Sequence, residues 1–322
     1  MIAKILFTAF MLLALLGCKQ QQDSTVLKLA HSLDTHHPVH KAIEYMAQRV
    51  ELHSGGKLEV DVYPGGQLGS ERQLMELLQI GSLAMTKVST SPMEGFVPEM
   101  KVFSLPYVFR DSDHYWRVLN SEIGKQLLLE GESVFLRGLA YYDAGSRSFY
   151  SVDKPIRTPD DLAGLKIRVQ QSQTAIQMVR ALGGAATPIS WGELYTSLQQ
   201  GVVDGAENNP PSFYSSKHYE VARYFSLNEH TMVPDMLLIS QYIWNKLSTQ
   251  EQHWLQTAVD ESVVFQRKLW KKSTQEALNI VEQAGVEVIY PDKAPFEEKV
   301  RALHAELKGT RTYEILQAIK AM

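Results

Sequence analysis

Apolar and polar residues follow two different periods along the first part of the chain. Residues 26–31 (VLKLAH) and 58–63 (LEVDVY) alternate with a period of two, which predicts strands with one buried face. Residues 38–54 begin with a proline, which suits a first helical turn, and two glycines follow them, so a helix is expected there. A second helix is expected over 70–80, with Ser70 as its N-cap. The order strand, helix, strand, helix indicates an α/β protein.

The same alternation continues through the middle of the chain. We expect strands near 83–89, 135–142, 148–152 and 165–169, and helices near 113–129, 174–182 and 191–200. Strands that alternate with helices of this length imply mixed, mostly parallel sheets with crossover helices. The chain shows neither an internal repeat nor a low-complexity tract.

One later stretch is unusually long for a helix. Residues 249–284 are 36 residues without glycine or proline, with apolar residues scattered between Trp254 and Trp270. A continuous helix over them would be about 54 Å long, which exceeds a normal domain helix. Such a helix could span two domains. The alternative is two helices separated by a break that the sequence does not mark.

The first residues indicate export. Residues 5–16 are apolar apart from one threonine and follow a single lysine, and the run is too short for a membrane-spanning helix of about 20 residues. Residues 15–18 (LLGC) resemble a bacterial lipobox, in which the cysteine is acylated and becomes the first residue of the mature protein. We therefore expect a lipoprotein signal peptide over 1–17 and a lipid anchor on Cys18. The alternative is an ordinary secretory signal with an incidental cysteine.

Composition narrows the class of protein. Cys18 is the only cysteine, so the mature domain can form no internal disulfide. The formal net charge of −4 becomes 31 − 36 = −5 once 1–17, with its one lysine, is removed. Neither a basic block nor a high isoelectric point appears, so no nucleic-acid partner is expected. A mature chain of about 300 residues is long enough for two domains.

Local signatures of catalysis are absent. The sequence contains no G-x-S-x-G, H-E-x-x-H, P-loop or G-x-G-x-x-G motif, although many active sites have no local motif. An exported, two-domain α/β chain with a long helix favours a receptor that closes around a solute.

Four segments carry a resemblance to a known family. Residues 54–85 (SGGKLEVDVYPGGQLGSERQLMELLQIGSLAM), 101–109 (KVFSLPYVF), 164–184 (GLKIRVQQSQTAIQMVRALGG) and 187–216 (TPISWGELYTSLQQGVVDGAENNPPSFYSS) occur in this order. They resemble the DctP-type solute-binding proteins of tripartite ATP-independent periplasmic (TRAP) transporters, and the resemblance covers about residues 26–320.

The resemblance implies a fold and a division of the chain. The fold is a two-domain periplasmic-binding-protein fold, type II-like, with a hinge between the domains and a long helix that spans both. The implied parts are a signal peptide over 1–17, a tether over 18–25, a first domain over 26–144 and about 234–270, and a second domain over 145–233 and about 271–322. The ligand cleft would lie between the domains.

The resemblance also assigns the carboxylate-binding residues. An arginine in the family's LKIRV strand pairs with the ligand carboxylate, and this position is Arg168; its guanidinium can bind a carboxylate with two parallel N–H groups. From the sequence alone, a surface arginine at a strand end would be the simpler interpretation. Arg147 matches a second arginine that reaches the bound acid, although Ala144 stands where relatives often have asparagine. Asn208 matches an asparagine that hydrogen-bonds the carboxylate.

Further residues are expected to contact the rest of the ligand. Trp191 would offer a flat apolar wall, or else belong to the core. The other candidates are polar side chains, and for those in the AENN segment the alternative is a polar turn; near Ser89, the family's sialic-acid branch tends to have an acidic residue. These candidates are Gln170, Gln171, Glu207, Asn209, Ser89, Arg72 and His37.

Three histidines close together invite a metal-site interpretation. His36, His37 and His40 share a helical spacing, but no acidic or cysteine partner is expected nearby, and Pro38 separates the first two from a continuous helix. A structural role at the helix start, or a ligand contact by His36 or His37, is the preferred interpretation. No metal and no cofactor are expected.

The expected protein is a periplasmic, lipid-anchored, non-enzymatic binding protein that delivers an organic acid to TRAP permease subunits in the membrane. The QQS and AENNPPS segments resemble the family's uronate-binding branch, and the remaining polar groups suit hydroxyls, whereas a second carboxylate would meet Glu207. We therefore expect a hexuronate, glucuronate or galacturonate, or a related sugar acid. The alternatives are a C4-dicarboxylate or other carboxylate, a sensory binding protein, or an enzyme that uses the same fold.

Overall fold

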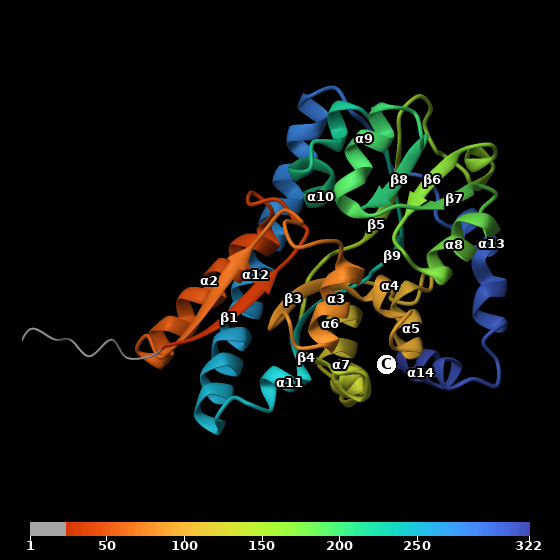
Figure 1. Ribbon diagram of the computed structural model, residues 1–322. Coiled ribbons are helices and arrows are strands. Elements are labelled where there is room, and N and C mark those ends of the chain that lie inside the picture. Colours follow the sequence, from red (N-terminus) through yellow and green to blue (C-terminus); the bar gives the residue numbers. More distant parts are fainter. Residues whose placement is uncertain (1–23) are drawn as a thin grey trace, which may run out of the picture.

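The computed structural model describes residues 24–322, which form two mixed sheets covered by helices (Figure 1). The expected signal peptide and the lipidation site at Cys18 lie outside the described residues. Of the expected tether 18–25, only Ser24 and Thr25 are described, and Thr25 already begins the first strand. No helix within 24–322 is both long and apolar enough to cross a membrane.

The first sheet has the strand order β2-β1-β3-β10-β4. Strands β1, β2 and β3 run parallel, and β10 pairs antiparallel with both β3 and β4. Apolar side chains of β10 alternate between two core clusters, because helices cover both faces of this sheet. The strands are β1 (Thr25–Ala30), β2 (Leu58–Tyr63), β3 (Met85–Ser89), β4 (Leu136–Tyr142) and β10 (Asp235–Ser240).

The second sheet has the order β11-β9-β5-β8-β6-β7. The pairs β11–β9, β8–β6 and β6–β7 are parallel, whereas β5 is antiparallel to β8 and β9. Two further core clusters cover its faces. The strands are β5 (Arg147–Ser151), β6 (Lys166–Val169), β7 (Ala185–Pro188), β8 (Gly205–Asn208), β9 (Tyr224–Thr231) and β11 (Glu287–Ile289).

The helices that cover the sheets are mostly short. Those of the first part are α2 (Pro38–Ser54), α3 (Glu71–Gln79), α4 (Thr90–Met93), α5 (Lys101–Ser104), α6 (Ser112–Leu119) and α7 (Glu122–Leu129). The later ones are α8 (Gln173–Ala181), α9 (Leu194–Gln199), α10 (Pro210–Ser215), α11 (Gln241–Trp244), α12 (Thr249–Gln283), α13 (Ala294–Ala305) and α14 (Arg311–Lys320). Short 3₁₀ helices are η1 (Pro98–Met100), η2 (Glu130–Val134), η3 (Pro159–Leu162), η4 (Trp191–Glu193) and η5 (His218–Glu220).

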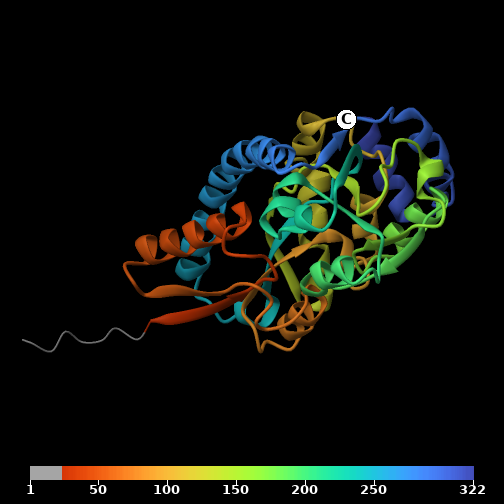
Figure 2. The ribbon, with the colours of Figure 1, turned by 90° about the horizontal axis from the view of Figure 1, so that it is seen from above.

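The expected long helix is confirmed as one continuous helix, and the two-helix alternative is wrong. Helix α12 contains 35 residues and begins with a capping box between Ser248 and Glu251. Leu255 and Val259 pack into a core cluster of the first sheet, and Val281 packs into a cluster of the second. Figure 2 shows α12 beside α2. The helix thus connects both halves of the molecule.

The crossover from β4 to β5 is fastened to the middle of α12. The side chain of Gln266 accepts a hydrogen bond from the backbone N–H of Asp143 and donates one to its carbonyl oxygen, both at 2.8 Å. Gly145 has φ +56°, and a Cβ there would lie 2.9 Å from Nε1 of Trp270, so only glycine fits without a shift. These contacts fix the crossover between the two sheets on α12.

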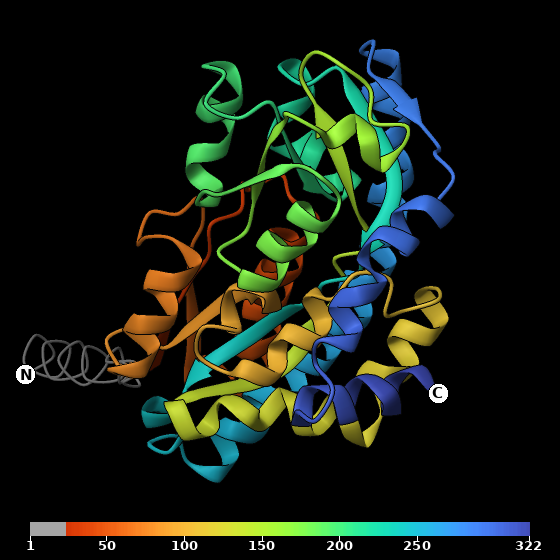
Figure 3. The same cartoon turned by 90° about the vertical axis from the view of Figure 1, so that its right-hand side faces the viewer.

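Two expectations about the helices need correction. The single helix expected over 113–129 is two helices, α6 and α7, because Ser121 caps α7 and its Oγ accepts a hydrogen bond from the backbone of Gly124. The last helix, α14, buries Leu316 and Ile319 in a core cluster of the first sheet, whereas α13 packs on the second. We therefore revise the expected assignment of all of 271–322 to the second domain. Figure 3 shows α13 and α14 passing from one half to the other.

Candidate functional site

A cavity of about 290 Å³ lies between the two sheets. Its polar residues come from the ends of β3, β6 and β8 and from the starts of β5, β10 and several helices. Ligands commonly bind at the carboxyl ends of strands in α/β proteins. Ten of the eleven expected ligand contacts line this cavity, namely His37, Arg72, Ser89, Arg147, Arg168, Gln170, Gln171, Trp191, Asn208 and Asn209.

Arg168 is a buried cation without a carboxylate partner. Its side chain is on β6, and the residue is 3% exposed. Nε donates to the carbonyl oxygen of Ile189 at 2.8 Å, and the guanidinium lies 5.6 Å from the ring centre of Trp191. Nη1 has no hydrogen-bond partner, and within residues 24–322 no carboxylate forms an ion pair with it. Burial lowers the pKa of Arg168 from its ordinary value.

Arg147, in contrast, is paired with a carboxylate. Nε and Nη2 donate to the two carboxylate oxygens of Glu207 at 2.5 and 2.8 Å, and Nη1 donates to Oδ1 of Asn208 at 2.9 Å. Burial alone would raise the pKa of Glu207, but the charge and hydrogen bonds of Arg147, together with the nearby His230, lower it to about 2. The pair is therefore ionised, and Arg147 holds the amide of Asn208 in place beside the cavity.

Glu207 is the expected ligand contact that the structure places elsewhere. The residue is 2% exposed and does not line the cavity, because its carboxylate faces Arg147 and approaches Nε2 of His230 at 3.5 Å. The expectation that it would meet ligand hydroxyls or repel a second carboxylate is corrected accordingly. Its contact is with Arg147.

Trp191 is a wall residue rather than a fully buried core residue. It begins η4 and is half-buried, and its ring lies 5.0 Å from that of His218. Burial and then the charge of Arg168 lower the pKa of His218 to about 3, so this imidazole is neutral. Trp191 therefore supports Arg168 on one side and faces the cavity on another.

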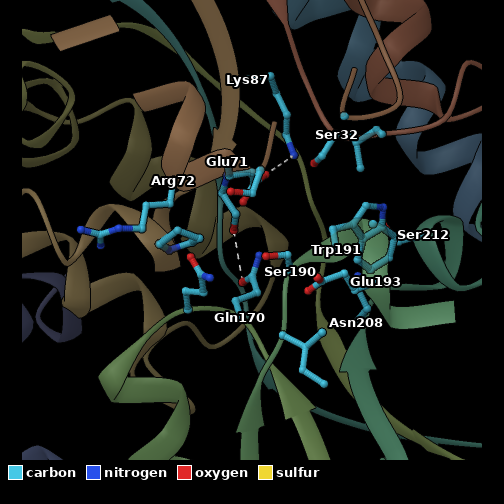
Figure 4. A pocket seen from close by; sticks show the side chains of 18 of the residues that line it. Ser32, Glu71, Arg72, Lys87, Gln170, Ser190, Trp191, Glu193, Asn208 and Ser212 are labelled. Carbon is cyan, nitrogen blue, oxygen red and sulfur yellow. Dashed lines mark hydrogen bonds and ion pairs between the residues drawn. The ribbon is translucent and has the colours of Figure 1, made fainter. Parts of the chain in front are cut away.

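Sequence reasoning missed a charged cluster on the opposite wall. Lys87, on β3, lies 3.0 Å from a carboxylate oxygen of Asp235 and 3.3 Å from one of Glu71. All three residues line the cavity, and Figure 4 shows Lys87 pointing toward Glu71. Burial alone would lower the pKa of Lys87, but the two carboxylates raise it. A lysine within the short strand MTKVS, which is buried throughout, was the available signal.

Three hydrogen bonds cross between the two halves near the cavity. Ser89 Oγ donates to Gln170 at 3.4 Å, which Figure 4 marks with a dashed line. Glu94, at the end of α4, accepts a hydrogen bond at 3.1 Å from the backbone N–H of Thr174 in the first turn of α8. The third bond joins His37 to Ser212. These contacts hold the walls together around the cavity.

His37 has a defined tautomer. Nδ1 accepts a hydrogen bond from the backbone of Val39 and caps α2, so Nε2 carries the proton and donates to Ser212 Oγ at 3.1 Å. Burial, then the charge of Lys87, lowers its pKa well below the ordinary value. The residue is therefore a neutral hydrogen-bonding group beside the cavity.

The remaining expected contacts differ in burial. Arg72 pairs with Glu76 at 3.1 Å and is half-exposed, and Figure 4 shows it directed away from Trp191. Gln171 is also exposed, so these two residues can contact only the exposed part of a ligand. Asn209 is buried, and its side-chain oxygen caps α10 by accepting a hydrogen bond from the backbone of Ser212.

The other two histidines do not join the site. Nδ1 of His36 lies 2.7 Å from Oδ1 of Asp34, so the expected lack of an acidic neighbour is wrong. His40 bonds to His31 at 3.0 Å. Among residues 24–322, no three His, Cys, Asp or Glu side chains are grouped as a metal site requires. His40 and His31 form a buried structural pair at the start of α2.

Comparison with known proteins gives consistent matches over nearly the whole chain. Residues 29–310 match the family model described as bacterial extracellular solute-binding protein, family 7. A TRAP periplasmic solute-binding protein from Xanthobacter autotrophicus, solved with bound β-D-galacturonate, is 39% identical with a TM-score of 0.89, covering 92% of this chain and 99% of that one. A second, from Anaerococcus prevotii with bound D-glucuronate, is 36% identical with a TM-score of 0.89 over 92% and 99% of the chains.

A more distant relative has a different printed ligand. The C4-dicarboxylate-binding periplasmic protein DctP of Rhodobacter capsulatus is 30% identical over 93% of this chain and 91% of its own. Two α/β halves that face each other across a polar cavity define the class, a two-domain solute-binding protein. The chain belongs to family 7 of the bacterial extracellular solute-binding proteins, the DctP family. The resemblance inferred from the sequence and the two-domain α/β fold are thereby confirmed.

Proposed function

We propose that this protein is the extracytoplasmic binding subunit of a TRAP transporter and captures a hexuronate, galacturonate or glucuronate, or a closely related sugar acid. It would then deliver the acid to permease subunits in the membrane. The observation that carries the proposal is the buried guanidinium of Arg168, which lines the cavity with a free Nη1 and no carboxylate partner within residues 24–322.

A buried cation without a countercharge is stabilised when an anion binds beside it. Leaving a charge buried and unpaired costs about 3–5 kcal/mol, so a ligand carboxylate that pairs with Arg168 would recover a large free energy. Ile189 and Trp191 hold the guanidinium in one orientation, which reduces the entropy lost when the ligand binds. The ordered amide of Asn208 would donate a further hydrogen bond to the same carboxylate.

The rest of the cavity favours hydroxyl groups over a second carboxylate. Arg147 and Lys87 are both already paired with carboxylates. Neutral polar groups from Ser89 and Gln170 remain, together with the face of Trp191. A pyranose suits this set because each hydroxyl can donate and accept, and its C–H face can lie on an aromatic ring. The galacturonate and glucuronate bound by similar proteins point the same way.

We further propose that the chain is exported to the periplasm and acylated at Cys18. The support is the LLGC sequence after a short apolar run, together with the extracellular nature of the family. Cys18→Ser should move the protein from the membrane fraction to the soluble fraction. Mass spectrometry of the native protein showing an unmodified Cys18 would remove the anchor from the proposal.

Calorimetric titration tests the proposed ligand. Galacturonate or glucuronate should bind at least tenfold more tightly than succinate or malate, which corresponds to about 1.4 kcal/mol. Succinate binding as tightly as either hexuronate, or no hexuronate binding at all, would overturn the ligand assignment.

A further inference from the structure

A further buried cation, Lys87, lines the cavity and is already paired with two carboxylates. We propose that Lys87, Glu71 and Asp235 form a selectivity cluster that binds ligand hydroxyls and excludes acids with a second carboxylate. This inference rests on the proposed function and deepens it, because it limits the substrates to polyhydroxy acids with one carboxylate.

The backbone fixes the position of the cluster. Lys87 and Ser89 are two residues apart on β3, so their side chains leave the same face of the strand. Asp235 is opposite Ser89 in the antiparallel pairing of β3 with β10. Glu71 begins α3, and one of its carboxylate oxygens accepts hydrogen bonds from the backbone N–H of Ser89 and from Lys87. The cluster is therefore fixed where β3 ends and β10 begins, and it cannot move away easily.

The charges of the cluster do not cancel. Burial raises the pKa of Asp235 to about 6, so this carboxyl group is mostly ionised at pH 7. At that pH Lys87 contributes one positive charge, and Glu71 and Asp235 contribute two negative charges, so the formal sum is 1 − 2 = −1. Ionised carboxylates only accept hydrogen bonds, so their remaining lone pairs require donors such as hydroxyl groups. A sugar whose carboxylate is held by Arg168 would present hydroxyls to this wall.

A second carboxylate would be disfavoured for two reasons. It would meet a wall with a net negative charge, and it could reach Lys87 only by displacing Glu71 or Asp235. The displaced carboxylate would then be buried without a cation, which is strongly unfavourable. Discrimination by repulsion and unpaired groups is a common source of binding specificity. The cluster thus prevents Lys87 from acting as a second anion site.

The test removes the two negative charges while it keeps their shape. In the double variant Glu71→Gln/Asp235→Asn, Lys87 is released, so succinate and the sugar diacid galactarate should bind at least tenfold more tightly than they bind the wild type. Galacturonate should bind at least tenfold more weakly, since two hydroxyl acceptors are weakened. The single variant Glu71→Gln keeps the Asp235–Lys87 pair and should fold even if the double variant does not; its diacid affinity should rise by a smaller factor.

The control is Glu122→Gln/Asp160→Asn, which removes the same two charges at exposed positions away from the cavity. It should leave all affinities unchanged. If neither cluster variant binds either diacid more tightly than the control does, the inference is overturned. The ratio of diacid affinities between variant and wild type is measured without any hexuronate. A failure of this inference can therefore be distinguished from a failure of the proposed function, in which the wild-type protein would not bind hexuronates.

Discussion

Arg168 and Lys87 face the same cavity from opposite walls, and each is 3% exposed. Lys87 lies within 3.3 Å of two carboxylates, whereas Arg168 forms no ion pair within the described part of the chain. Burial alone therefore does not identify a ligand anchor. The difference lies in the countercharge, because only the cation without one gains a large free energy from a ligand carboxylate.

The largest expected difference between the two cations is in stability. Lys87→Met leaves two buried carboxylates without a cation and should lower the free energy of unfolding by about 3–5 kcal/mol. Arg168→Met removes an unpaired buried charge, so the free protein should be as stable as the wild type or more so. Urea unfolding without ligand measures both changes. Equal destabilisation by the two substitutions would contradict the comparison.

Ligand affinity should depend strongly on Arg168. Arg168→Ala should weaken hexuronate binding by about 2–5 kcal/mol, and Arg168→Lys should not restore it, because an ammonium group lacks the two parallel N–H donors. Calorimetry measures the affinities, with Arg180→Ala, on the exposed face of α8, as the matched control. Near wild-type affinity in Arg168→Ala would show that the carboxylate binds elsewhere.

The buried pair of Arg147 and Glu207 should give a smaller change in the free energy of unfolding, and this change should depend on pH. The pKa of Glu207 in the folded protein, about 2, lies below its ordinary value of 4.5. Its stabilising contribution is therefore complete above pH 4.5 and is lost as the pH falls toward 2. Glu207→Gln removes the charge but keeps an oxygen that can accept a hydrogen bond from Arg147, so it should lower stability at pH 7 by about 1–3 kcal/mol. The gap to the wild type should shrink on acidification, as unfolding curves from pH 7 to pH 2.5 can measure; a constant gap would contradict the ionised pair.

The smallest expected effect concerns the contact between the walls. Ser89→Ala removes the hydrogen bond to Gln170 and one group facing the ligand, so affinity should fall by about 0.5–1.5 kcal/mol. Thr196→Ala, remote from the cavity on α9, is the control for a hydroxyl lost elsewhere. A loss in Ser89→Ala as large as that in Arg168→Ala would mean that closure of the walls, and not the anchor, dominates binding.

Local signals in the sequence predicted the elements well. Helix α2 and strand β2 have the expected bounds, because Pro38, two glycines after Ser54 and the alternation in β2 are all local features. The break at Ser121 was missed because a serine cap within an otherwise helical pattern is a weak signal. Helix α14 could not be assigned from the sequence, since its partner core lies far away in the chain.

The candidate site shows the same limit. Arg168 was found through the LKIRV segment, and its neighbours followed from their place after a strand. The cluster of Lys87 with Asp235 depends on pairing between β3 and β10, which no local pattern reveals. The direction of Glu207 also depends on pairing, because β8 and β5 bring it to Arg147.

A double-mutant cycle tests most directly whether Arg168 holds the single carboxylate of the ligand. Wild type and Arg168→Met are each titrated with glucuronate and with glucuronamide, its uncharged amide. We expect a coupling energy of about 2 kcal/mol or more, with the acid strongly preferred by the wild type and nearly equal binding of acid and amide by Arg168→Met. An acid-over-amide preference of the same size in both proteins would contradict it.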